Sequence, residues 1–160
     1  MNRGFALAGI ALTGVVSVGV ALYTQHALNM QPCPWCVLQR LIMLVMAATA
    51  LLGLLAHGLR LITLRGALAG LTALVATSGA AAALWQHFVA AQSSSCAMTW
   101  ADRIMGATGL DSRWPEVFAA YASCADAKVK LLGLPYEFYS LALFIVVMVV
   151  AAMVMRSLRR

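Results

Sequence analysis

The sequence is 160 residues long, and 63% of its residues are hydrophobic whereas only 10% are charged. A soluble domain of this length needs far fewer apolar residues for its core, so the composition excludes an ordinary soluble protein and indicates a membrane protein. The formal net charge of +6 would favour a nucleic-acid partner if the basic residues formed one surface. They are divided among several loops instead, and no nucleic-acid partner is expected.

Four apolar runs are each long enough to cross about 30 Å of hydrocarbon as an α-helix, which takes roughly 20 residues. Their apolar residues lie all round the predicted helix rather than along one stripe. We therefore predict an all-α, polytopic membrane protein, a four-transmembrane-helix bundle that forms a single membrane domain over residues 1–160. The predicted spans cover about residues 5–23, 37–56, 66–85 and 136–155, and the predicted outer loops cover about residues 24–36 and 87–135.

The charged residues predict the orientation of these spans. Basic residues flank the runs at three places that an even number of crossings puts on one side, namely Arg3, Arg60 and Arg65, and Arg156, Arg159 and Arg160. All five acidic residues lie between or beside the third and fourth runs. The positive-inside rule then places both termini and the short turn from Arg60 to Arg65 in the cytoplasm, with membrane lipids as partners of the basic residues.

The first run contains Gly4, Gly9, Gly14 and Gly19, one at every fifth position. Residues five positions apart do not share one face of a helix, so this spacing predicts ordinary helix packing rather than a dimerisation stripe. We therefore expect a monomer. A cleaved signal peptide over residues 3–23 is the alternative. That reading is disfavoured because the run is longer than a usual signal core, and its removal would leave an odd number of crossings.

The first outer loop is short and ends in two cysteines, Cys33 and Cys36, at the start of the second run. Pro34 restricts the backbone between them, and the dipole of the predicted helix favours a thiolate at Cys36. Arg40 follows at i+4, on the same helix face, and a cation there would stabilise that thiolate further. The alternative for Arg40 is an anchor whose charged head reaches the lipid headgroups.

The third run ends in Trp85, which suits the boundary between water and lipid, and in His87. Apolar and charged residues alternate in the long loop that follows, which predicts one or two short helices on the membrane surface. A loosely ordered loop is the alternative, because the periodicity is imperfect. Residues 131–135 are expected to close the loop, with Pro135 at the start of the fourth helix.

Four cysteines occur, at positions 33, 36, 96 and 124, and the predicted topology places all of them on the oxidising outer side. Only one pair has the spacing of a zinc site, so no metal is expected. A static disulfide is plausible between Cys96 and Cys124, where it would close a long loop. A bond between Cys33 and Cys36 closes almost no loop and stabilises little, so this pair is more typical of electron exchange.

Electron exchange requires an acceptor. Reoxidation of a strongly oxidising dithiol protein, which has a potential of about −120 mV, needs an acceptor more oxidising than other protein disulfides. The sequence has no flavin, haem or nucleotide motif, and Cys33 and Cys36 lie at the predicted membrane edge. A quinone dissolved in the lipid, ubiquinone or menaquinone, fits that location.

The order of these elements resembles the DsbB family, membrane proteins that reoxidise the periplasmic protein DsbA and pass electrons to a quinone. The resemblance covers essentially the whole chain, and a CxxC pair followed by Arg at the mouth of a membrane helix is its most specific part. The residues that carry it are Pro32-Cys33-Pro34-Trp35-Cys36, Gln39-Arg40, Cys96, Trp114-Pro115-Glu116-Val117-Phe118, Cys124 and Leu132-Gly133-Leu134-Pro135.

The resemblance implies a quinone-dependent thiol oxidase in which two cysteine pairs act in series. Cys96 would form the mixed disulfide with a DsbA-like partner, and Cys124 would resolve it. Cys33 and Cys36 would form the second pair, with Cys36 meeting the quinone and Arg40 polarising a quinone oxygen. His87 lies near a family position linked to quinone handling, although an ordinary helix-end residue is equally consistent. The alternative function is a disulfide-stapled membrane scaffold or small transporter without redox turnover.

Overall fold

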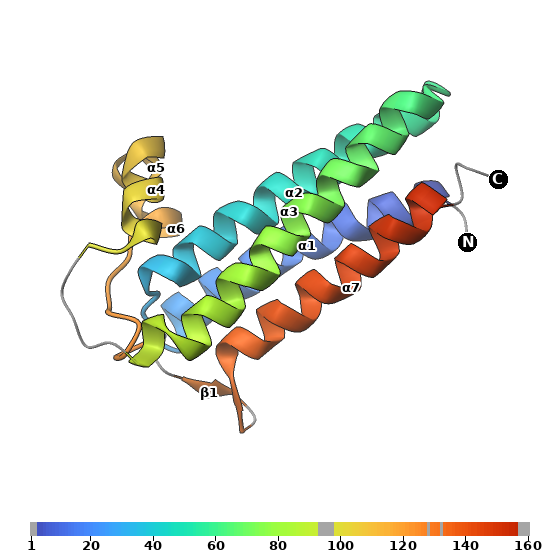
Figure 1. Ribbon diagram of the computed structural model, residues 1–160. Helices are drawn as coiled ribbons and strands as arrows, with labels where there is room; N and C mark the ends of the chain where they lie inside the picture. The colour runs from blue at the N-terminus through green and yellow to red at the C-terminus, as the bar shows by residue number, and fades with distance from the viewer. Residues whose placement is uncertain (1–2, 93–97, 128, 132, 157–160) are drawn as a thin grey trace.

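A computed structural model describes residues 3–92, 98–127, 129–131 and 133–156 of the protein. Four long helices run side by side and form the body of the molecule (Figure 1). All four are long and apolar enough to cross a membrane, which confirms the predicted all-α, four-helix membrane fold. They are α1 (Arg3–Ala27), α2 (Pro34–Gly58), α3 (Ile62–Phe88) and α7 (Tyr136–Arg156).

Each helix extends beyond the predicted apolar run at one end or both. The difference arises because polar residues such as Thr24 and Gln25 continue the helix after the apolar run has ended. A helix of 25 residues, such as α1, is longer than the roughly 20 residues that span the hydrocarbon, so its ends reach past the apolar layer. The division of the chain into one membrane domain stays a prediction.

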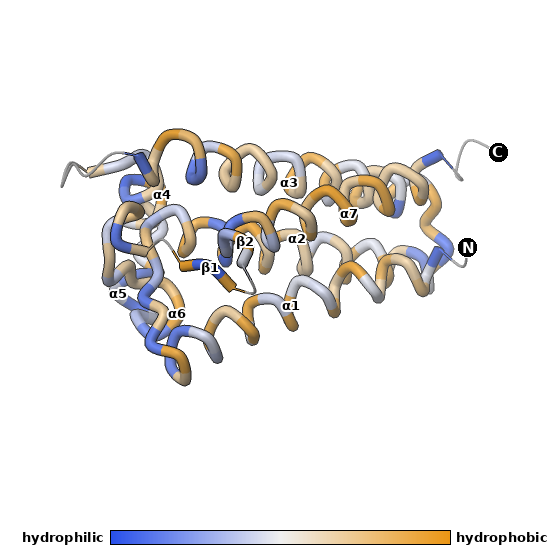
Figure 2. Tube along the Cα trace, turned by 90° about the horizontal axis from the view of Figure 1, so that it is seen from below, coloured by the Kyte–Doolittle hydropathy of each residue, from blue (hydrophilic) through white to orange (hydrophobic). Residues whose placement is uncertain are grey.

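The two ends of the bundle are formed by different segments of the chain. The start of α1, the end of α7 and the turn between α2 and α3 lie at one end, and the short helices of the long loop lie at the other (Figure 1). We call the second one the cysteine end, because Cys33, Cys36 and Cys124 lie there. Hydrophilic residues gather at the two ends, and the long middle part of the helices is mainly hydrophobic (Figure 2).

Two glycines allow the long helices to approach closely. A Cβ atom at Gly14 of α1 would lie 2.8 Å from the backbone oxygen of Met43 in α2. A Cβ atom at Gly79 of α3 would overlap the ring of Phe144 in α7, a fully buried side chain at the centre of the bundle. Gly9 and Gly19 have open space at the same position, so only part of the glycine series in the first run serves packing between the described helices.

The long loop contains helices, as the first of the two alternatives predicted. After a 3-10 turn (Ala90–Gln92) and residues outside the described part come α4 (Trp100–Thr108), α5 (Leu110–Arg113) and α6 (Pro115–Phe118). The side chain of Thr99 caps α4 by accepting from the Asp102 backbone N–H, and Asp102 accepts from the Thr99 backbone in return. Met105 of α4 and Phe118 of α6 pack on the first turns of α2, which fixes the loop over the cysteine end.

A small antiparallel hairpin precedes the last helix, where the sequence predicted a simple loop closure. Its strands are β1 (Lys130–Leu131) and β2 (Leu134–Pro135), and Gly133 adopts the positive φ of 85° that a tight turn needs. Pro135 therefore ends a strand instead of starting the helix, and α7 begins one residue later. Proline is tolerated there because an edge strand does not need its missing N–H.

Candidate redox site at the cysteine end

The first turn of α2 carries the CxxC pair. Cys33 is the N-cap of the helix, and its sulfur accepts a 3.4 Å hydrogen bond from the backbone N–H of Cys36. Pro34 occupies the first helical position, where its fixed φ suits a helix and its missing N–H costs nothing. The Sγ atoms of Cys33 and Cys36 lie 2.9 Å apart. The local sequence thus brings the two sulfurs together at the positive end of a helix dipole, as predicted.

Cys124 joins this pair from the other end of the long loop. The backbone N–H groups of Tyr121 and Ala122 donate hydrogen bonds of 3.0 and 3.3 Å to the carbonyl oxygen of Pro32. These bonds dock the segment before Cys124 beside the CxxC motif, where Cys124 and Cys33 are buried in one cluster. Cys33 therefore contacts both of the other described cysteines. Cys96, the fourth cysteine, lies outside the described residues.

The contact between Cys33 and Cys124 gives their thiols different acidities. The pKa of Cys33 is raised above its ordinary value by a hydrogen bond with Cys124, by a second one with Cys36 and by burial. The same hydrogen bond from Cys33 lowers the pKa of Cys124 below its ordinary value, and a bond from the Trp35 backbone adds to this. When both cysteines are reduced, Cys124 is therefore the better nucleophile, whereas Cys33 stays protonated.

Two glutamine side chains form a hydrogen-bonded series that ends at Cys36. Gln86 of α3 is buried, and its Nε2 atom donates a 3.2 Å hydrogen bond to the sulfur of Cys36. Gln39 of α2 is also buried, and its amide donates to Oε1 of Gln86. The Gln39 amide occupies the oxygen of the Gln86 amide, so the N–H group of Gln86 faces the sulfur. The sequence analysis did not identify either glutamine as a site residue. A glutamine at the end of an apolar run could have indicated one, because polar side chains in a membrane helix often mark a functional site.

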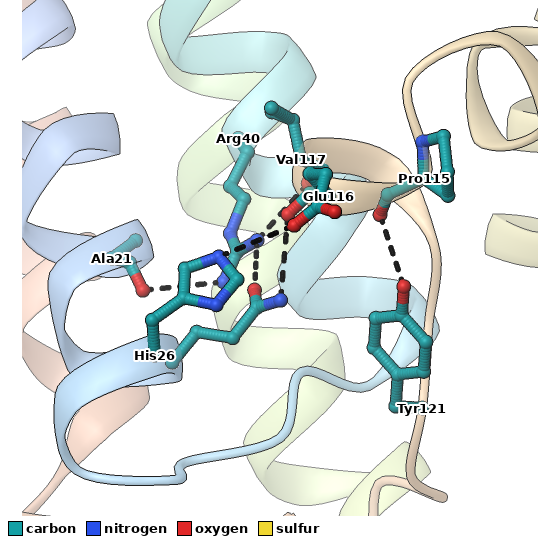
Figure 3. Close-up of polar contacts among 8 residues, drawn as sticks. Ala21, His26, Arg40, Pro115, Glu116, Val117 and Tyr121 are labelled. Atoms are coloured by element: carbon teal, nitrogen blue, oxygen red, sulfur yellow. Dashed lines mark hydrogen bonds and ion pairs between the residues drawn. The ribbon is translucent and has the colours of Figure 1, made fainter.

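The Arg40 guanidinium is buried and donates three hydrogen bonds to oxygen atoms (Figure 3). Nη1 donates to Oε1 of Gln25 at 2.7 Å and to the carbonyl oxygen of Val117 at 3.0 Å, and Nη2 donates to the carbonyl oxygen of Ala21 at 3.4 Å. A headgroup anchor would carry its charged end into water, whereas this side chain is only 5% exposed. The geometry favours a cation held inside the protein.

A cavity of about 230 Å³ opens beside these residues, between the cysteine-end halves of α1, α2 and α7. Its wall is mainly apolar, with side chains such as Val20, Met43 and Leu143. Polar side chains interrupt that wall, and they include Cys36, Gln39, Arg40, Gln86, Tyr136, Glu137 and Tyr139. An apolar pocket with a few convergent polar groups is typical of a small-molecule site.

His87 does not line this cavity, although its partner does. Its Nδ1 atom lies 2.7 Å from Oε1 of Glu137, a cavity residue. The imidazole ring packs against the rings of Phe88 and Phe138, with centroid distances of 4.9 and 4.7 Å. The predicted part of His87 in cofactor binding stays a prediction, and any effect of His87 on the cavity passes through Glu137.

The site contains further residues that the sequence alone did not identify. Gln25 and Tyr136 are examples, and the first holds Arg40 whereas the second lines the cavity. No local pattern marks them, because Gln25 meets Arg40 15 positions away and Tyr136 meets Thr24 112 positions away along the chain. The signal available was the presence of polar side chains inside or next to the apolar runs.

Comparisons with known proteins identify the family of the chain. The family model for disulfide bond formation protein DsbB matches residues 3–154. Similar proteins include disulfide bond formation protein B of Pseudomonas syringae pv. tomato, 31% identical over 94% of this chain and 90% of the relative. The protein of the same name in Nitrosomonas europaea is 30% identical over 96% and 92%, and that of Herminiimonas arsenicoxydans is 32% identical over 91% and 90%. The chain belongs to the DsbB family of disulfide bond formation proteins.

Proposed function

We propose that the protein oxidises a periplasmic DsbA-like dithiol protein and passes the two electrons through its cysteine pairs to a membrane quinone. The observation that carries this proposal is the position of Cys36. Its sulfur contacts Cys33 on one side, and the same residue lines the apolar cavity beside Arg40 on the other. One residue is thus in reach of both a thiol and a lipid-soluble acceptor.

The electron path is a series of thiol–disulfide exchanges. A thiolate of the partner attacks the Cys96–Cys124 disulfide at Cys96, which forms a mixed disulfide and releases Cys124 as a thiolate. The second thiol of the partner then displaces Cys96, so the partner leaves oxidised and the pair is reduced. The Cys96–Cys124 dithiol next reduces the Cys33–Cys36 disulfide, and the contact of Cys124 with Cys33 supports an attack at Cys33.

The cavity residues fit a quinone by their chemistry. A quinone combines an apolar ring and tail with carbonyl oxygens, and when bound it supplies a two-electron, two-proton acceptor. Val20, Met43 and Leu143 offer apolar contact to the ring. Arg40 would hold and polarise a carbonyl oxygen, because it is a permanent cation fixed in the cavity wall. Cys36, kept in place by the Gln86 amide, delivers the electrons.

The proposed orientation follows from the charges. Arg60 and Arg65 lie at the opposite end of the bundle from the cysteines, together with the start of α1 and the end of α7 (Figure 1). The positive-inside rule supports a cytoplasmic location for that end of an inner-membrane protein and a periplasmic location for the cysteine end. A periplasmic partner would then reach Cys96, and the protein would act as a monomer among membrane lipids.

Turnover with defined components tests this proposal. The purified protein, a reduced DsbA-like protein and a soluble quinone analogue are combined without oxygen, and the free thiols of the partner are counted with time. We expect catalytic loss of partner thiols that requires quinone and that stops in the Cys36→Ser variant. Equal turnover without quinone would contradict the proposal. Inert cysteines in the wild-type protein would support the scaffold alternative.

A further inference from the structure

The pair of His87 and Glu137 joins the end of α3 to the start of α7. The Glu137 side chain is 9% exposed and that of His87 is 29% exposed, and 2.7 Å separates their nearest atoms. Burying such a pair removes hydration from both groups, so a buried ion pair is weak evidence for stability, and apolar side chains would often serve packing as well. A function for the pair is therefore worth testing.

The two residues differ in what they face. Glu137 lines the cavity that also contains Cys36 and Arg40, whereas His87 lies behind it, between Phe88 and Phe138. Because His87 keeps nearly a third of its side chain exposed, it has access to the surroundings at the cysteine end. The pair forms a hydrogen-bonded connection from the outside of the bundle to the cavity.

The proposed reaction needs such a connection for protons. Two electrons and two protons leave the Cys33 and Cys36 thiols when their S–S bond forms, and a quinone needs two protons when it accepts two electrons. Among the described cavity residues, the titratable or charged side chains are Cys36, Arg40, Tyr136, Glu137 and Tyr139. Arginine does not lose its proton in proteins, and tyrosine ordinarily does so only near pH 10. Glu137 is the cavity residue whose carboxyl group is joined to the partly exposed His87, so it has a hydrogen-bonded connection to the surroundings.

We propose that Glu137 donates protons to the quinone in the cavity and is reprotonated by His87. This inference rests on the function proposed above. In each proton transfer the carboxyl O–H bond of Glu137 breaks as an O–H bond forms on the quinone. When His87 carries protons on both ring nitrogens, its Nδ1–H bond then breaks as the carboxyl O–H bond of Glu137 is restored, and Nδ1 is reprotonated from water before the next transfer. Two such transfers supply the two protons that the quinone needs. The two thiol protons are released to water at the cysteine end.

A second pair of the same residue types provides a matched control. His26 and Glu116 lie 3.8 Å apart at the same end of the bundle, and their side chains are 55% and 81% exposed. Glu116 does not belong to the cavity wall. The variants Glu137→Gln and Glu116→Gln each keep an amide oxygen that can accept from the histidine, and each removes a carboxyl group that can carry a proton.

The experiment separates quinone binding from proton transfer. Quinone affinity is measured on the oxidised protein by quenching of tryptophan fluorescence, and quinone reduction by the fully reduced protein is followed by absorbance in a single turnover. We expect Glu137→Gln to leave the affinity and the exchange with the thiol partner unchanged, and to slow quinone reduction on the order of 100-fold. Glu116→Gln should change none of these quantities.

Chemical rescue tests the part of His87. The variant His87→Ala should slow quinone reduction, and imidazole added to the solution should restore it because imidazole can carry a proton. The 1,3-dimethylimidazolium ion has a similar shape but no exchangeable N–H, and it should not restore the rate. Equal restoration by both compounds would show a packing role and overturn the inference, as would Glu137→Gln with wild-type rates. If the wild-type protein itself does not reduce quinone, the proposed function fails and this inference fails with it.

Discussion

Nη1 of Arg40 donates a 2.7 Å hydrogen bond to Oε1 of Gln25, which ties α2 to α1 at the cysteine end. Gln25 is itself 4% exposed, and its amide donates to the Glu116 carbonyl oxygen at 3.4 Å. The guanidinium is therefore fixed by a buried side chain and by backbone carbonyls from two other segments. A cation held in this way keeps one orientation toward the cavity before any ligand arrives, which reduces the entropic cost of binding.

Replacing Arg40 by lysine tests whether the fork shape of the guanidinium matters. Lysine keeps a positive charge but cannot reproduce several fixed donors, so Gln25 and the Val117 carbonyl would lose a partner. A hydrogen bond to a charged group contributes about 1.5–3 kcal/mol, so we expect quinone affinity to fall roughly 10- to 150-fold. Arg103→Lys, in α4 and outside the cavity wall, is the control. Equal affinities in both variants would remove Arg40 from the binding site.

Replacing Gln86 by leucine removes the amide that donates to the Cys36 sulfur. A thiolate loses a stabilising hydrogen bond, and a hydrogen bond to a charged group contributes about 1.5–3 kcal/mol, so we expect alkylation of Cys36 in the reduced protein to slow roughly 10- to 150-fold. Mass spectrometry after timed labelling measures this rate. Gln92→Leu alters an exposed glutamine and serves as the control. An unchanged rate in Gln86→Leu would mean that the amide does not act on the sulfur.

The acidity of Cys124 depends on Cys33. The Cys33 thiol lowers the pKa of Cys124, so between the lowered and the ordinary pKa the wild-type Cys124 is a thiolate. In Cys33→Ala the pKa of Cys124 rises, the residue is protonated in that pH range, and its alkylation slows. Cys33→Ser keeps a hydroxyl donor and should retain part of the fast reaction. The pH profile of Cys124 labelling in the reduced protein measures the shift, and coincident profiles for all three proteins would refute it.

The close approach of α3 and α7 depends on Gly79. A methyl group there would lie 2.6 Å from Cδ1 of Phe144, so the ring or the helix must move. Overpacking of this kind costs typically about 1–3 kcal/mol, and we expect Gly79→Ala to lower the free energy of unfolding in detergent by that amount. Gly19→Ala introduces the same methyl group at a position where none of the described residues offers an atom within 4 Å. If both variants unfold alike, the contact does not limit the packing of the bundle.

The parts of the structure that sequence could predict are those with local causes. Apolar length predicts the four helices because the hydrocarbon thickness sets the number of residues. The position of Cys36 in the first turn of α2 follows from Pro34 and the apolar run after it. Both features depend on neighbours in the chain, so no knowledge of the tertiary arrangement was needed.

The rest depends on residues far apart in the sequence. Arg40 meets the carbonyl of Val117, 77 positions later, and His87 meets Glu137, 50 positions later. No periodicity carries that information, because these contacts arise only when the helices pack. The hairpin at residues 130–135 was missed for a different reason, since two-residue strands contain too few residues to show alternation.

The most direct test of the account uses a variant in which Cys33 and Cys36 are the only cysteines. The double variant Cys96→Ser with Cys124→Ser is reduced, freed of reductant and mixed with an equal amount of quinone without oxygen. Free thiols and reduced quinone are then counted in the same sample. The account predicts that both thiols are lost as one disulfide and that one quinone is reduced per protein. Thiols that persist while quinone is bound would contradict it.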